Sequence, residues 1–175
     1  MEILNSKQID SKIENLAKEI VKQNIDNIIV IGIQTKGVSV AKRLSRKIES
    51  IKNMKEQIPF GILDITLYRD DLQEAGADIP TIKDTNIPCD INNKNIILVD
   101  DVLYTGRTIR SALDVLKDFG RPQSIKLAVL VDRGYRELPI QPDFVGLIHH
   151  TKNRICVDMN DDVSNDDKVV VIDDK

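Results

Sequence analysis

Apolar residues along the chain follow helical spacing in some segments and form short continuous runs in others. Over residues 6–23 they recur at intervals of three and four, which predicts an amphipathic helix. Its apolar positions are Ile9, Ile13, Leu16, Ile20 and Val21. A β-branched run at 28–31, followed by Gly32, predicts a buried strand. Helical spacing returns over 38–51 and predicts a second helix.

The second half of the chain continues this alternation. Residues 58–68 alternate in two phases, which predicts a strand with a bend near residues 61–63. Residues 69–93 show little periodicity and predict a functional loop or a hairpin. Helical spacing over 106–119 ends at Gly120 and predicts a third helix. Further strands are predicted at 96–99, 125–131, 144–148, 154–158 and 168–172.

Strands alternating with helices predict an α/β fold with a mostly parallel sheet and right-handed crossovers. The 175 residues suit a single domain, 1–175, and neither an internal repeat nor a linker interrupts them. Hydrophobic residues make up 41% and charged residues 30%, a globular balance. We find no apolar run of the roughly 18 residues that a membrane helix needs, and no signal-peptide pattern, so we expect a cytoplasmic protein that does not bind membranes.

Charge and cysteine content narrow the chemistry further. The net charge of −3 makes nucleic-acid binding less expected as the main role. Cys89 and Cys156 have no ligand spacing and are expected to be free thiols. His149 and His150 are neighbours on a predicted strand, point to opposite faces and cannot chelate one ion together. The acidic segment 158–167 lacks a calcium-loop pattern and is expected to be a solvated turn.

The segment "LVDDVLYTGRT" (98–108) carries the strongest chemical signal. Asp100 and Asp101 follow an apolar strand, at the sheet edge where open α/β sheets bind ligands. Residues 105–108 open a helix, whose unpaired N–H groups and dipole favour an anion. A phosphate there, with the carboxylates on ribose hydroxyls or a hydrated Mg²⁺, fits a sugar phosphate. The alternative is a capped helix beside surface acids.

This segment resembles the phosphoribosyl pyrophosphate (PRPP) signature of type I phosphoribosyltransferases. Other segments resemble one branch of that family, the bifunctional pyrimidine-operon regulator/uracil phosphoribosyltransferases of PyrR type. They are "IGIQTKG" (31–37), "DITLYRDDL" (64–72), "GRP" (120–122) and "LAVLVDRGYRELPI" (127–140). The resemblance implies a type I phosphoribosyltransferase fold, a central, mostly parallel, twisted sheet flanked by helices with a small hood or hairpin region.

The resemblance also implies the reaction, in which uracil and PRPP give UMP and pyrophosphate. The transition state is expected to resemble a ribosyl oxocarbenium ion, whose charge suits neighbouring carboxylates. Asp100, Asp101 and Arg69 are the expected catalytic residues. Those expected to bind PRPP are Asp100, Asp101, Val102, Leu103, Tyr104, Thr105, Gly106, Arg107 and Thr108.

Three smaller sites follow from the same resemblance. Pyrophosphate is expected on Thr35, Lys36, Gly37 and Arg69, where Lys36 replaces the arginine of the family and loses its bidentate geometry. Mg²⁺ is expected to arrive with PRPP and to be placed by Asp70 and Asp71. The residues expected to bind the base are Val131, Asp132 and Arg133.

A competing function is RNA binding, in which the protein attenuates transcription of the pyrimidine operon as a UMP sensor with little catalysis. This sequence departs from the family's RNA surface, since Gln141 replaces an arginine and Tyr135 a histidine. Arg136 and Lys152 are the residues we expect to touch operon mRNA. The other candidate cations are Lys36, Lys42, Arg43, Arg46 and Arg133. The family also implies a homodimer or a higher homo-oligomer.

Overall fold

The computed structural model describes residues 1–66 and 85–173. The strands are β1 (Glu2–Asn5), β2 (Ile28–Ile33), β3 (Phe60–Leu63), β4 (Asn95–Leu103), β5 (Ser124–Asp132), β6 (Phe144–Ile148), β7 (Arg154–Asp158) and β8 (Lys168–Ile172). The helices are α1 (Ser6–Lys22), α2 (Lys36–Ile51) and α3 (Arg107–Leu116), and a 3₁₀ turn, η3 (Lys117–Phe119), extends α3.

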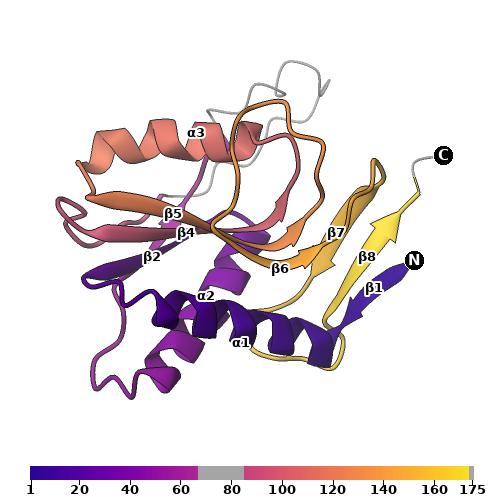
Figure 1. Ribbon diagram of the computed structural model, residues 1–175, viewed down its shortest axis with the longest axis horizontal. Helices are drawn as coiled ribbons and strands as arrows, with labels where there is room; N and C mark the ends of the chain where they lie inside the picture. The colour runs from indigo at the N-terminus through magenta and orange to yellow at the C-terminus, as the bar shows by residue number, and fades with distance from the viewer. Residues whose placement is uncertain (67–84, 174–175) are drawn as a thin grey trace.

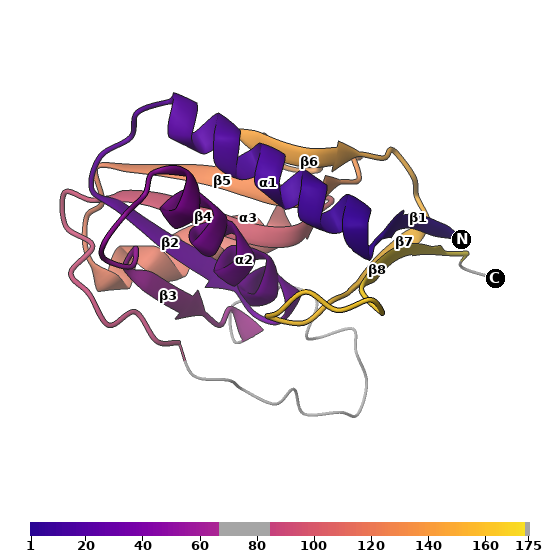
Figure 2. The same cartoon turned by 90° about the horizontal axis from the view of Figure 1, so that it is seen from below.

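The main sheet has five parallel strands in the order β3-β2-β4-β5-β6. Figures 1 and 2 show α1 and α2 on one face of this sheet and α3 on the other. The predicted α/β class with a parallel sheet and flanking helices is therefore confirmed. Within residues 1–66 and 85–173, no helix has the length and apolarity that a membrane span requires.

A second, three-stranded sheet has the order β1-β8-β7 and is antiparallel throughout. It lies beside the N-terminal end of α1 (Figure 1). The Met1 ammonium donates to the Val171 carbonyl oxygen at 2.7 Å, and the Val171 N–H donates to the Met1 carbonyl oxygen at the same distance. Strand β1 was not predicted, because its few residues stand beside a much stronger helical pattern.

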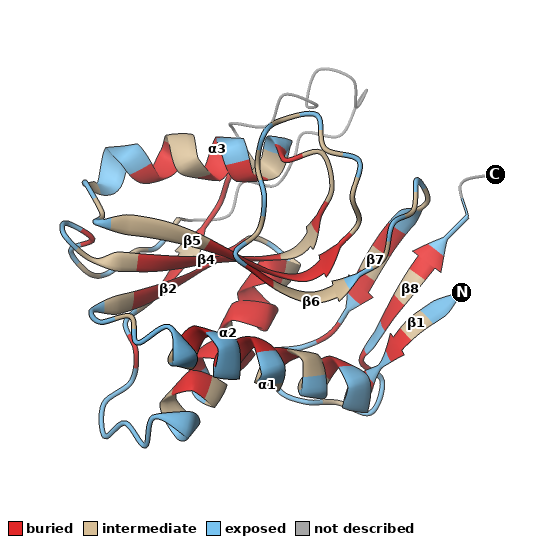
Figure 3. Ribbon diagram, viewed as in Figure 1, coloured by how far each residue is buried: buried red, intermediate tan, exposed pale blue. Residues whose placement is uncertain are grey.

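Burial of both sheet faces explains the continuous apolar runs of the central strands. Along β2, Val30 faces the cluster under α1 and α2, whereas Ile29 and Ile31 face the cluster under α3. Strands β4 and β5 alternate in the same way, and Figure 3 shows the middle of each central strand buried, with intermediate residues toward the ends. A strand covered on both faces needs apolar residues at every position, so its sequence shows no alternation.

Most predicted boundaries agree with the structure within a few residues, with two informative exceptions. Strand β4 extends to Leu103, so Asp100 and Asp101 lie inside the strand and not beyond it. Strand β3 covers only four residues of the predicted 58–68 strand, because the chain leaves the sheet after Leu63. Cys89 and Cys156 are free thiols, as expected.

Candidate functional site

Three strand ends meet at the carboxyl edge of the main sheet. Gly32 of β2 pairs with Val99 of β4, and Leu103 of β4 pairs with Asp132 of β5. The segments that follow these strands therefore lie next to one another. They are the β2–α2 turn (34–37), the β4–α3 turn (104–108) and the segment after β5 (133–140). The sequence predicted all three as parts of one site.

The β2–α2 turn is hydrogen-bonded to β3 and packs tightly against β4 through Gly37. The Gln34–Thr35 peptide bond is cis, and the Gln34 N–H donates to the Leu63 carbonyl oxygen at 2.9 Å. Thr35 precedes the first residue of α2, and its side chain does not cap the helix. The N–H groups of the first turn of α2 thus lack a side-chain cap, an arrangement that suits an anion.

The two aspartates of β4 differ in exposure. Asp100 is buried, with 5% of its surface exposed, whereas Asp101 is half-buried. The Asp101 N–H donates to Asp100 Oδ1 at 2.9 Å, which holds the Asp100 carboxylate beside the strand. The partly open Asp101 carboxylate is thus the one better placed to meet a ligand, while Asp100 is fixed by the fold.

Helix α3 begins at a glycine that suits an anion. Gly106 precedes the helix with a φ of 94°, a left-handed conformation that side chains disfavour. No side chain caps the helix, although the Arg107 N–H lies 3.4 Å from Thr105 Oγ1. The first-turn N–H groups of α3 and the hydroxyl groups of Thr105 and Thr108 therefore form a second place for a phosphate.

The segment after β5 covers the β4–α3 turn. The N–H groups of Glu137 and Leu138 both donate to the Thr105 carbonyl oxygen, at 3.0 and 3.1 Å. The Glu137 carboxylate also pairs with Arg107 Nε at 2.7 Å. The two longest motifs of the sequence, 98–108 and 127–140, are therefore parts of one packed unit.

Asp132 and Arg136 form a pair that the sequence did not reveal. Arg136 Nη2 donates to Asp132 Oδ2 at 2.8 Å, and both side chains are only 12% exposed. The remaining Arg136 donors reach the carbonyl oxygens of Tyr104, Gly134 and Ile140. Arg136 was expected on an RNA surface. It instead connects the β4–α3 turn to the segment after β5, inside the protein. Its spacing of four residues from Asp132 is the only signal in the sequence.

Arg133 is also engaged inside the protein. Its guanidinium group stacks over the Tyr104 ring at 3.8 Å and donates to the carbonyl oxygens of Thr151 and Lys152. The Arg133 side chain thus holds the 151–152 segment beside the predicted base site. Lys152 itself is exposed, and its ammonium group lies 5.8 Å from the ring centre of Tyr135.

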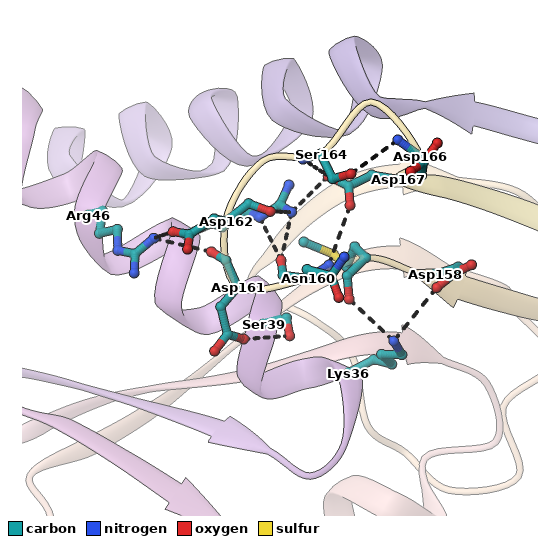
Figure 4. A network of polar contacts seen from close by, with 12 residues as sticks. Lys36, Ser39, Arg46, Asp158, Asn160, Asp161, Asp162, Ser164, Asp166 and Asp167 are labelled. Carbon is teal, nitrogen blue, oxygen red and sulfur yellow. Dashed lines mark hydrogen bonds and ion pairs between the residues drawn. The ribbon is translucent and has the colours of Figure 1, made fainter.

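The acidic loop, residues 158–167, is exposed at most of its residues, as the sequence predicted, but it also makes buried contacts that the sequence did not reveal. It lies along α2 and accepts hydrogen bonds from that helix (Figure 4). Arg43 donates to the carbonyl oxygens of Asn160 and Asp162 and pairs with Asp167 at 2.7 Å. The side chains of this pair are 3% and 1% exposed. The sequence did not reveal these contacts because the partners lie more than a hundred residues apart.

Three further pairs connect the same two elements. Ser39 and Lys42 both donate to the Asp161 carboxylate, and Arg46 pairs with Asp162 at 2.6 Å. Hydrogen bonds from Lys42 and Ser39 lower the pKa of Asp161. Burial opposes ionisation of Asp167, but the Ser164 N–H and the Arg43 guanidinium group together lower its pKa. Three of the cations considered for RNA are therefore neutralised by the protein's own carboxylates. They are Lys42, Arg43 and Arg46.

The remaining expectations concern Arg69, the expected Mg²⁺ ligands Asp70 and Asp71, and a metal site. Arg69, Asp70 and Asp71 lie outside the described residues. In the described part of the chain, no three His, Cys, Asp or Glu side chains gather as a metal cluster. Residues 1–66 and 85–173 thus contain no dedicated metal cage. The carboxylates at the predicted sugar-phosphate site are those of Asp100 and Asp101.

Comparison with known proteins agrees with this architecture. A family model of the phosphoribosyl transferase domain matches residues 1–164. Hypoxanthine phosphoribosyltransferase from Trypanosoma cruzi superimposes with a TM-score of 0.74 at 17% identity, over 98% of this chain and 94% of that chain. The Staphylococcus aureus enzyme of the same name gives 0.67 at 19% identity, over 89% and 80%. The chain therefore has the type I phosphoribosyltransferase fold.

Sequence relatives define the branch. A protein from Endomicrobium trichonymphae named bifunctional protein PyrR is 54% identical over 159 residues, 89% of this chain and 90% of that protein. Another of that name, from Caldicellulosiruptor bescii, is 46% identical over 173 residues, 97% and 93%. The chain belongs to the family of bifunctional PyrR proteins. The resemblance seen in the sequence is confirmed.

Proposed function

We propose that this protein transfers the phosphoribosyl group of PRPP to uracil, giving UMP and pyrophosphate. The observation that carries the proposal is the meeting of two anion-binding helix starts, α2 and α3, with the Asp100–Asp101 pair between them. One helix start suits the pyrophosphate and the other the 5′-phosphate of the same substrate. Their common strand edge fixes the two phosphate groups relative to the ribose.

Each residue then has a role that its position supports. The N–H groups at the start of α3, with Thr105 and Thr108, bind the 5′-phosphate. Asp101 accepts hydrogen bonds from the ribose hydroxyls, and its negative field stabilises the positive charge that grows at C1′. Lys36 and the N–H groups at the start of α2 hold the leaving pyrophosphate.

The described residues fit Mg²⁺ that arrives with PRPP. Mg²⁺ keeps several waters and is commonly held by one or two carboxylates together with substrate phosphates. Asp100 and Asp101 provide that number, and the structure describes no third carboxylate beside them. Bound there, Mg²⁺ would neutralise charge on the phosphates. The proposed contributions of Arg69, Asp70 and Asp71 belong to the segment outside the described residues.

The base is expected beside Val131 and Asp132, at the end of β5. Because Arg136 holds Asp132 and Arg133 holds the 151–152 segment, the walls of this site are fixed by internal bonds. With these side chains engaged, backbone groups remain to read the edges of uracil.

The direct test is formation of UMP by the purified protein from uracil, PRPP and Mg²⁺, followed by chromatography. We expect UMP with uracil and none with hypoxanthine. Failure to form UMP in the presence of Mg²⁺ would refute the proposal. Formation of a purine nucleotide at a higher rate would refute the choice of base.

We propose a second function, regulation of the pyrimidine operon by UMP-dependent binding of its mRNA. The observation that favours it is the 54% identity to a protein named bifunctional. Lys152 is the expected phosphate contact that remains exposed, since Arg136 donates inward. A gel shift with the operon leader RNA should be strengthened by UMP and weakened by salt. No shift at low salt would refute regulation while leaving the enzymatic proposal intact.

A further inference from the structure

Lys36 is held by the protein itself at the place where the proposed function requires it to bind pyrophosphate. Its ammonium group donates to the Met159 carbonyl oxygen at 3.2 Å and lies 3.8 Å from the Asp158 carboxylate (Figure 4). Both partners belong to the acidic loop. An anion bound at the β2–α2 turn would draw the ammonium group toward itself, and the attraction of Asp158 opposes that movement.

We propose that Asp158 competes with the pyrophosphate group of PRPP for Lys36 and thereby limits the affinity of the β2–α2 turn for PRPP. This inference rests on the proposed function, which puts pyrophosphate at that turn. Asp158 then tunes the affinity for PRPP. It acts through Lys36 and does not itself touch the substrate.

A comparison of the four ion pairs between α2 and the acidic loop shows which cation can leave its carboxylate for another anion. Arg43 and Asp167 are buried, and Lys42 and Arg46 pair with their carboxylates at 2.5 and 2.6 Å. The Lys36–Asp158 separation is the longest of the four, and its side chains are 39% and 60% exposed. The buried Arg43–Asp167 pair fixes the loop, and Asp158 itself ends β7 and pairs with Lys168 of β8, so that Asp158 stays in place while Lys36 moves.

The surface beside Lys36 leaves room for that movement. A hollow of about 430 Å³ lies between the start of α2 and the acidic loop, open to solvent. Thr35, Lys36 and Ser39 line one side of it, and residues 159–162 line the other. The Lys36 side chain can thus rotate from the loop toward the N–H groups of the β2–α2 turn without displacing the buried Arg43–Asp167 pair.

The test is the variant Asp158→Asn, which keeps the size of the side chain and removes its charge. We expect the KM for PRPP and the inhibition constant of product pyrophosphate to fall together by about twofold to fivefold, the range for a partly exposed ion pair. The KM for uracil should not change, because the contact lies on the pyrophosphate side. Added salt should reduce the difference between the variant and the wild type.

Two controls separate this competition from a general charge effect. Asp166→Asn removes the same charge from the same loop, at an exposed residue whose backbone N–H contacts Ser164. It should leave the KM for PRPP close to that of the wild type. In a Lys36→Met background, Asp158→Asn should have no effect, since the competed group is gone.

A rise or no change in the KM for PRPP would overturn the inference, as would an equal fall in Asp166→Asn or an effect that persists without Lys36. If the wild-type protein forms no UMP, the proposed function fails by itself. Calorimetric binding of pyrophosphate with Mg²⁺ to the wild type and to Asp158→Asn then tests the competition directly. Equal affinities in that measurement would overturn it.

Discussion

Gly37 lies directly against Asp100. A Cβ atom on residue 37 would stand 3.0 Å from Asp100 Cα and 2.8 Å from the Val99 carbonyl oxygen. The first turn of α2 therefore approaches β4 as closely as a backbone can. This contact sets the distance between the proposed pyrophosphate site and the carboxylates proposed to hold the ribose.

We expect Gly37→Ala to force α2 away from β4. The neighbouring atoms belong to the backbone, which cannot give way as a side chain does, so overpacking should cost about 1–3 kcal/mol of unfolding free energy. The KM for PRPP should rise as well, because the two halves of its site separate. Urea unfolding and initial-rate kinetics measure the two effects.

A matched control for that change is Gly61→Ala, where the nearest neighbours are the flexible side chains of Ile31 and Ile87 at 3.3 Å. Its effect on stability should be smaller and its effect on the KM for PRPP negligible. Equal behaviour of the two variants would contradict the role of the Gly37 contact.

Asp101→Asn should lower kcat by two or more orders of magnitude while the protein remains folded. The amide keeps the shape of the side chain but removes the negative field at C1′, and groups of this kind contribute about 3 kcal/mol to transition-state stabilisation. UMP formation at saturating substrates gives kcat, and circular dichroism checks the fold. Asp118→Asn, at an exposed residue near the end of α3, should behave as the wild type. Near-normal turnover of Asp101→Asn would show that this carboxylate does not act on the ribose.

Arg43→Met should be the most destabilising change in the acidic loop contacts. It leaves the Asp167 carboxylate, 1% exposed, without its cation, and removal of one partner of a buried pair costs about 3–5 kcal/mol. Arg46→Gln breaks the exposed pair with Asp162 in the same two elements and should cost about 1 kcal/mol or less. Urea unfolding at neutral pH compares the two. A loss of similar size in both variants would contradict the structural role of the buried pair.

The same carboxylates should make stability depend on acid pH. The folded-state pKa values of Asp161 and Asp167 are lowered, so the unfolded chain takes up protons first as the pH falls. Their contribution is present above about pH 4, the ordinary pKa of aspartate, and is lost as the pH falls through the lowered values. Unfolding free energies measured between about pH 3 and 7 should therefore decline less steeply for Asp167→Asn than for the wild type. Equal steepness would mean that Asp167 is not stabilised as an anion.

Local patterns predicted the parts of the fold whose causes are local. Helices α1 and α2 and the apolar runs of β2, β4 and β5 each carry a periodicity or a run that does not depend on distant residues. The sites at the strand ends followed as well, because parallel strands bring their carboxyl ends to one edge. Strand β1 was missed, since four residues carry too little pattern beside a long helix.

The contacts that fix the site depend on residues distant in sequence, and these were not predictable. Arg136 looked like a free surface cation, yet its donors are used by Asp132 and three carbonyl groups. Nothing local distinguishes a cation that faces solvent from one that faces a carbonyl group of another segment. The contacts between the acidic loop and α2 were missed for the same reason.

The sequence alone determined the fold class and the family, because each rests on local spacing or on motifs that stay together in the chain. Only the tertiary structure decided which charges are available. It joined Arg43 to Asp167 across 124 residues and placed Asp158 beside Lys36. Charge pairing depends on distance in space and on burial, and neither is written in the order of the residues.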